Sequence, residues 1–279
     1  MKKIFFSLAL LSSLGLAASF QIMENKMIKI EFALGKNIVE TAKISGIPEY
    51  GVSNVDDYIE YSARPLPTTV PVIYTSPGYE ITLVPAFSLV LSADRRRTPN
   101  DIVSGARIRM ANKHITTHGE GQLFVESLVE KFNKSKWKRH IPALCPAVTG
   151  RSSFLDATGN INSMGCPLDP KYKVKPDEWI KILKDGQNYE WIGDGVFASI
   201  SVGYDDDTRG TTYNVVVEFE DYATKIQVDS ENEARKQKEG DAKGWNTTAK
   251  AQRNLMIQAE IIEELEGSAI KRGDSIISR

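Results

Sequence analysis

The chain has 279 residues, 41% of them hydrophobic and 25% charged, a composition typical of globular proteins. This length is enough for one large domain or two small ones, each with a packed core. The 35 basic and 36 acidic side chains give a net charge of −1, which excludes long-range attraction to nucleic acid or to an anionic membrane. We therefore expect no nucleic-acid partner.

Residues 1–19 have the pattern of a secretory signal peptide. Lys2 and Lys3 precede the apolar run Ile4–Leu16, and the small residues Ala17–Ser19 follow. The run is shorter than the roughly 20 apolar residues that a membrane-spanning helix needs, and no cysteine follows it for lipid attachment. The pattern predicts export to the periplasm with cleavage after Ser19, and no stable membrane insertion.

The region 20–115 is predicted to be rich in β-structure. Five prolines between residues 48 and 77 disfavour long helices. Pro71 cannot donate to a hydrogen-bonded ladder, so we expect its strand at a sheet edge. One short helix is predicted at 37–44. Alternating polarity and β-branched or aromatic residues predict strands at 58–61, 70–74, 79–91 (interrupted at Pro85) and 102–110.

Two helices are predicted in the region 116–228. The first covers residues 121–133, where Val125, Leu128, Val129 and Phe132 recur with helical spacing; Thr117 or His118 is expected to cap it. The second begins at Pro176, a favoured first helical position, and ends at Gly186. Its buried face is expected to contain Trp179, Ile180 and Leu183.

Strands are predicted at 189–192, 196–204 and 213–220. The last two flank the polar segment 205–210, which is expected to form the turn of an antiparallel hairpin. Grouped strands with helices between them indicate an α+β fold, with antiparallel sheets, a few packed helices and a C-terminal helix.

Residues 229–279 are predicted to be a charged C-terminal helical segment. Gly240, Gly244 and Asn246 are expected to interrupt any single helix. A helix is predicted at 247–266, with a narrow apolar stripe through Leu255 and Ile262, and the tail from Gly267 is expected to be frayed.

The two cysteines, Cys145 and Cys166, both lie in the exported part of the chain. Such a pair in an oxidising compartment predicts a disulfide, which closes a loop rich in turn-forming residues and contributes roughly 3 kcal/mol. The alternative is a catalytic thiol at Cys145, which requires a histidine close by.

Three clusters carry possible chemistry, and each also has a structural interpretation. His114 and His118 have a spacing seen in metal pairs, but in an extended segment they lie roughly 13 Å apart. Asp205, Asp206 and Asp207 offer oxygens to calcium, yet lack the alternating spacing of an EF-hand loop. Ser135 and Lys138 match S-x-x-K, but also fit a basic flank after a helix. We therefore expect no enzyme activity, no metal and no cofactor.

Charge and aromatic residues suggest surfaces for a protein partner. Arg95-Arg96-Arg97 and the segment 131–140 are basic, whereas the 205–210 segment and the C-terminal helix are acidic. Trp179 is expected in the core and Trp245, in a Gly- and Asn-flanked break, on the surface, where tryptophan is a frequent hot spot. The candidate partner-binding residues are Asp205, Asp206, Asp207, Trp245, Glu263 and Glu264.

Two patterns between residues 118 and 220 resemble a known class of exported proteins. The first pattern begins with His118-Gly119-Glu120, continues with the amphipathic helix and ends with Trp137-Lys138-Arg139-His140-Ile141-Pro142. The second is Asp177-Glu178-Trp179 followed by the strands predicted between residues 189 and 220. Together they resemble the immunity proteins encoded beside antibacterial type VI secretion effectors, especially those of the lipase class. The resemblance implies a non-catalytic periplasmic inhibitor that occludes the active site of a secreted toxin. The missing lipid-attachment cysteine departs from those members that are lipid-anchored.

The leading hypothesis is therefore a periplasmic protein that neutralises an effector by protein–protein binding. One alternative is a periplasmic hydrolase of cell-wall or ester substrates that uses Ser135 and Lys138, or a metal at His114 and His118. Another is an envelope structural protein whose C-terminal helix pairs with a partner helix.

Overall fold

The computed structural model describes residues 29–111, 115–161, 165–184, 186, 188–207 and 210–278. The predicted signal peptide lies outside the described residues, as does His114.

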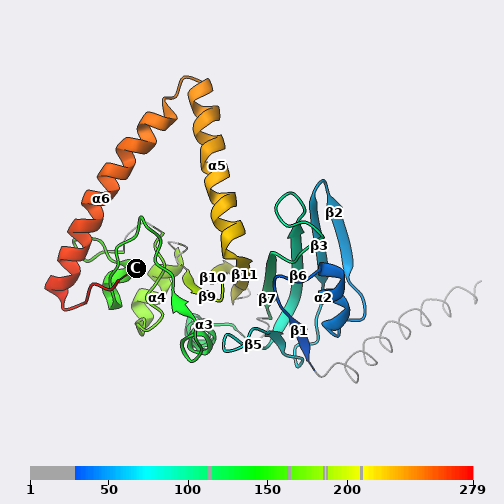
Figure 1. Cartoon of the computed structure of the whole chain (residues 1–279). Coiled ribbons are helices and arrows are strands. Elements are labelled where there is room, and N and C mark those ends of the chain that lie inside the picture. Colours follow the sequence, from blue (N-terminus) through cyan, green and yellow to red (C-terminus); the bar gives the residue numbers. More distant parts are fainter. Residues whose placement is uncertain are drawn as a thin grey trace, which may run out of the picture.

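An eight-stranded antiparallel sheet organises the fold (Figure 1). It contains strands from both the 20–115 and the 116–228 regions, and it confirms the α+β class. In spatial order its strands are β2 (Gly51–Val55), β3 (Tyr58–Ala63), β6 (Ala86–Asp94), β7 (Gly105–Met110), β11 (Gly210–Asp221), β10 (Val196–Asp207), β9 (Tyr189–Gly193) and β8 (Lys138–Arg139).

The predicted hairpin between β10 and β11 is confirmed but is longer than expected. Its ladder runs from Val196 opposite Asp221 to Asp207 opposite Gly210. Asp205 and Asp206 therefore lie in a strand, and the prediction of a turn there is wrong. Backbone pairing continues because alternating side chains at the end of a two-stranded ribbon can point into solvent on either face.

A second, three-stranded sheet has the order β1 (Ile30–Phe32), β4 (Val72–Tyr74) and β5 (Ile81–Leu83). The expectation that Pro71 places its strand at an edge is wrong, because β4 is central. Pro71 lies just outside the strand, where its carbonyl accepts a hydrogen bond from the Ile30 amide at 2.9 Å. Pro85 separates the apolar run 79–91 into β5 and β6, which belong to different sheets.

The helices follow the predicted pattern with shifted ends. The short helix α2 (Ile38–Ile44) is capped by Asn37. Helix α3 (His118–Asn133) begins three residues earlier than expected, because Thr117 and Glu120 form a reciprocal capping box. Helix α4 (Pro176–Lys184) buries Trp179, Ile182 and Leu183, whereas Ile180 is half-buried.

Aromatic side chains join the two sheets and α3 into one core. Tyr74 of β4 stacks on Phe219 of β11 with centroids 4.5 Å apart, and Phe132 of α3 stacks on Trp191 of β9 at 4.2 Å. Trp137 contacts both Phe132 and Phe219. Such contacts add specific geometry to a large buried apolar area.

The C-terminal part differs most from expectation. Helix α5 (Tyr222–Ala242) continues directly from β11 and contains Gly240, which does not interrupt it; the break comes at 243–246. Helix α6 (Thr247–Arg272) extends six residues past the predicted end. The tail is not frayed, because Ile276 forms a β-bridge with Val148 and the Thr149 amide donates to the Ser275 carbonyl at 2.9 Å.

The close approach of α3 to β11 depends on Gly121. A Cβ atom there lies 2.3 Å from the Tyr213 ring, whose hydroxyl accepts a hydrogen bond from Trp179 Nε1 and is also hydrogen-bonded to His118 Nδ1. We predict that Gly121→Ala lowers the free energy of unfolding by about 2 kcal/mol through overpacking.

Gly119→Ala is the matched control, because it changes the same helical turn where no atom lies within 4 Å. This substitution should raise stability by up to about 1 kcal/mol through helix propensity. Denaturant unfolding of both variants measures the difference, and equal stabilities would contradict the packing argument.

Candidate functional site

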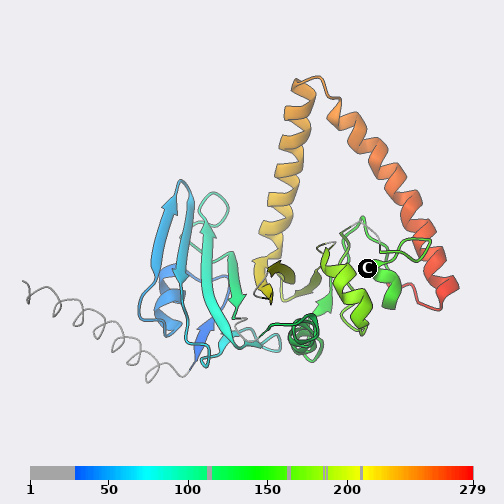
Figure 2. The same ribbon diagram turned by 180° about the vertical axis from the view of Figure 1, so that it is seen from behind.

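The most distinctive feature of the molecule is a helical arm made of α5, the connection 243–246 and α6. Figures 1 and 2 show α5 leaving the sheet, the chain turning at an apex, and α6 returning to the body near the C-terminus. The helices have 21 and 26 residues, which correspond to lengths of about 31 and 39 Å. The arm is therefore a frame attached to the body at both ends.

The first end is the root of α5. Asp221 caps the helix by accepting from the Thr224 amide at 2.8 Å. The Lys225 ammonium lies 4.8 Å over the Phe197 ring, 3.2 Å from Asp229 and 3.7 Å from Glu220. Burial acts to lower the pKa of Lys225, but the carboxylates around it raise the pKa overall, so the lysine stays charged.

Arg97 ties α5 to the N-terminal strands through ion pairs with both Asp94 and Glu231. Arg96 also pairs with Asp94, and Arg95 pairs with Asp101 at 2.6 Å. Hydrogen bonds, chiefly from Arg96, hold the pKa of Asp94 below its usual range. The arginine triplet that the sequence suggests as a basic surface is thus largely neutralised by its own carboxylates.

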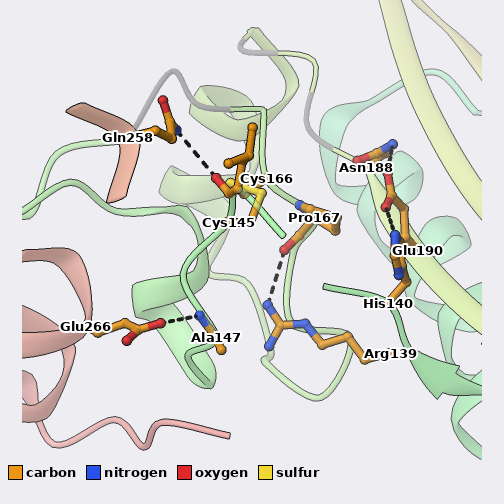
Figure 3. Close-up of a disulfide and its surroundings, with 11 residues drawn as sticks. Arg139, His140, Cys145, Ala147, Cys166, Pro167, Asn188, Glu190, Gln258 and Glu266 are labelled. Carbon is orange, nitrogen blue, oxygen red and sulfur yellow. Dashed lines mark hydrogen bonds and ion pairs between the residues drawn. A yellow bond between two sulfur atoms is a disulfide. The ribbon is translucent and has the colours of Figure 1, made fainter. Parts of the chain in front are cut away.

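The second end is the foot of α6, which rests on the loop closed by the Cys145–Cys166 disulfide (Figure 3). The disulfide confirms the prediction, with Cα atoms 5.6 Å apart. Glu266 accepts from the Ala147 amide at 3.0 Å, and Gln258 donates to the Leu144 carbonyl at 3.4 Å.

Further bonds fix the end of α6. Arg272 donates to the Ser152 hydroxyl at 2.9 Å and to the Asp156 carbonyl at 3.2 Å, and Asp274 accepts from the Ser152 amide at 3.0 Å. Leu265 and Ala269 are buried beneath the helix. The foot therefore combines apolar packing with several charge-assisted hydrogen bonds.

The apex has a defined geometry of its own. The Trp245 amide donates to the Gly240 carbonyl at 3.0 Å, and Asp241 accepts from the Thr248 amide at 3.1 Å and from its hydroxyl at 2.5 Å. The Trp245 side chain is 57% exposed, as the sequence predicts, with the Lys243 ammonium 4.8 Å over its ring.

Large apolar side chains are exposed along the arm. Met256 is 70% exposed, and Leu255, Ile257 and Ile261 are also exposed. Three exposed carboxylates, Glu260, Glu263 and Glu264, lie among them and have no ion-pair partner among the described residues. We call these seven residues the α6 patch: Leu255, Met256, Ile257, Glu260, Ile261, Glu263 and Glu264.

The predicted partner-binding residues lie on three separate elements. Glu263 and Glu264 belong to the α6 patch and Trp245 to the apex, whereas Asp205 and Asp206 lie on β10. The structure does not bring β10 and the arm together at these residues. Of Asp207 only its place in the strand is described.

The residues considered for catalysis or metal binding make structural contacts. Trp179 Nε1 donates to the Tyr213 hydroxyl at 3.1 Å, and the same hydroxyl is hydrogen-bonded to His118 Nδ1 at 2.8 Å. His118 Nε2 lies 3.8 Å from an Asp206 carboxylate oxygen. Ser135 donates to the Phe132 carbonyl at 2.7 Å at the end of α3, and Lys138 lies in β8. No three-ligand metal cluster occurs within the described residues.

Sequence reasoning missed Met256, Ile257 and Ile261 of the α6 patch, and it placed Leu255 in the apolar stripe of the helix, whereas the Leu255 side chain is exposed. A signal was available, because Leu255, Met256 and Ile257 are consecutive. Successive helical residues are rotated by about 100°, so three apolar neighbours cannot all face the same core.

Comparison with protein-family models, curated proteins and solved structures finds no match for this chain. None of the helices in the described part of the chain combines the length and apolar character needed to cross a membrane.

The apex depends on the absence of a side chain at Gly240, where a Cβ atom lies 1.8 Å from the Thr247 hydroxyl oxygen. We predict that Gly240→Ala forces α5 and α6 apart and changes the distance between spin labels at Ser230 and Asn254. Labels on non-natural residues keep the native disulfide intact.

Gly267→Ala is the control, because this helical glycine of α6 has no atom within 4 Å of the added carbon. It should leave the label distance unchanged and stabilise the helix by up to about 1 kcal/mol. An unaltered distance in Gly240→Ala would show that the apex does not set the arm geometry.

Proposed function

We propose that the protein is an exported inhibitor that binds a protein partner through its arm. We further propose that it acts in the periplasm and that its partner is a secreted antibacterial effector. The α6 patch is the observation that carries the proposal, because several large apolar side chains left exposed on one helix of a folded protein are typical of interaction surfaces.

The attachment of the arm at both ends supports a binding role. A surface that is ordered before binding does not lose conformational entropy when the partner arrives. The exposed Trp245 adds an aromatic anchor of the kind enriched at interface hot spots. The carboxylates of the patch favour a partner with basic groups around an apolar centre.

The disulfide supports a location outside the cytoplasm, because such bonds persist in oxidising compartments. Export and the periplasmic address rest on the sequence of residues 1–19. Mass spectrometry of the protein recovered from the periplasm should give a mature N-terminus after Ser19.

The experiment that tests the function is co-expression with a candidate toxin encoded by an adjacent gene. We predict that cells producing the toxin in the periplasm survive only with this protein, and that Ile257→Glu weakens binding of the purified toxin at least about tenfold. Calorimetry measures the affinity and colony counts measure the protection.

Leu123→Glu is the matched control, because Leu123 is 69% exposed but lies on α3, outside the arm. It should leave affinity and protection unchanged. Survival that does not depend on the protein would refute the inhibitor function, whereas equal effects of the two variants would refute the assignment to the arm.

A further inference from the structure

A groove of about 740 Å³ lies at the end of the large sheet, away from the arm. One wall is the loop 65–68 with the neighbouring Phe87, and the other is the β10–β11 hairpin. This volume is within the range of small-molecule and peptide sites. Like many such sites, the groove combines apolar walls with a few polar groups.

A guanidinium group with unused donors marks one end of the groove. Arg109 of β7 donates from Nε to the Asn214 side-chain oxygen at 2.9 Å. In the part of the chain that the structure describes, its two terminal nitrogens have no partner. By contrast Arg107, two residues earlier on the same face, pairs with Glu218 at 2.5 Å. A guanidinium oriented in this way presents a fork suited to a carboxylate.

A carboxylate marks the other end. Strand alternation sends Asp206 toward His118 and its neighbour Asp205 to the opposite face, where Asp205 lines the groove. Asp205 has no hydrogen-bond or ion-pair partner among the residues described. The groove therefore holds one cationic and one anionic group that residues in the described part of the chain leave uncompensated.

The strand register gives the spacing of the two charges. Asp205 is opposite Thr212 and Arg109 is opposite Val216, but the Arg109 side chain reaches back to Asn214. The charges are thus offset by two residues, about 7 Å, along β11 and by at least one strand spacing, about 4.8 Å, across it, which gives a separation of roughly 8 to 9 Å or more. An extended peptide of two or three residues spans this distance between its termini.

We propose that this groove binds a short peptide whose two termini are both free. The terminal carboxylate pairs with Arg109 and the terminal ammonium with Asp205, while apolar side chains of the peptide contact Phe87 and the proline loop 65–68. The site is independent of the arm and does not rest on the inhibitor function.

The test uses the intact, disulfide-bonded protein and a pool of di- and tripeptides of Ala, Leu and Phe with free termini. Binding is followed by amide chemical shifts of β7, β10 and β11 at peptide concentrations up to about 1 mM. We expect saturable shifts at these strands. Arg109→Gln and Asp205→Asn should each weaken binding at least about tenfold.

Matched probes and variants decide the assignment. A C-amidated peptide pool should bind the wild-type protein weakly, and Arg109→Gln should not weaken this binding further. An N-acetylated pool should also bind the wild-type protein weakly, and Asp205→Asn should not weaken that binding further. Arg107→Gln and Asp206→Asn are the controls and should leave binding unchanged. Absent shifts, equal binding of capped and free pools, or an equal loss in a control would each overturn the proposal.

Discussion

The attachment of the α6 foot to the disulfide-closed loop is the constraint on which the arm depends. Without it, the arm would be held only at the root of α5, and the long polar helix α6 would have no support from the body; such helices are marginal in isolation. Buried Leu265 and Ala269, with the bonds of Glu266, Arg272 and Asp274, fix the far end. The arm is thereby part of the fold, and its exposed residues are held in place before any partner binds.

The β10–β11 hairpin links this constraint to the core. Its inward face carries Phe219 into the aromatic cluster, its last residue, Asp221, caps α5, and its far end forms one wall of the outer groove. The direction in which the arm leaves the body is therefore set by the sheet. The hairpin thus forms part of the outer groove directly and connects to the α6 patch only through α5 and the apex.

Local physics predicted much of the fold and less of the site. Local sequence patterns predicted helix α3, the β10–β11 hairpin and the disulfide, since each of these depends mainly on residues that are near one another in the sequence. The central position of β4 and the docked tail depend on contacts far apart in the sequence; the Asp274–Ser152 bond spans 122 positions. Likewise, charged α5 is stabilised by Arg97 and Phe197, which no local pattern reveals. The exposure of Trp245 was predictable from its flanking residues, but the patch around Met256 required knowledge of which side of α6 meets the body.

The location of the protein and the geometry of its arm are physically connected. The foot of α6 rests on a loop rich in turn-forming residues, whose unfolded alternatives the disulfide restricts. In a reducing compartment this restriction is lost, and the segment that forms hydrogen bonds with Glu266 and Gln258 is less strongly constrained. An ordered arm is therefore favoured where disulfides persist, which agrees with the proposed location outside the cytoplasm. The Cys145–Cys166 disulfide thus connects the proposed location of the protein with the order of its proposed binding surface.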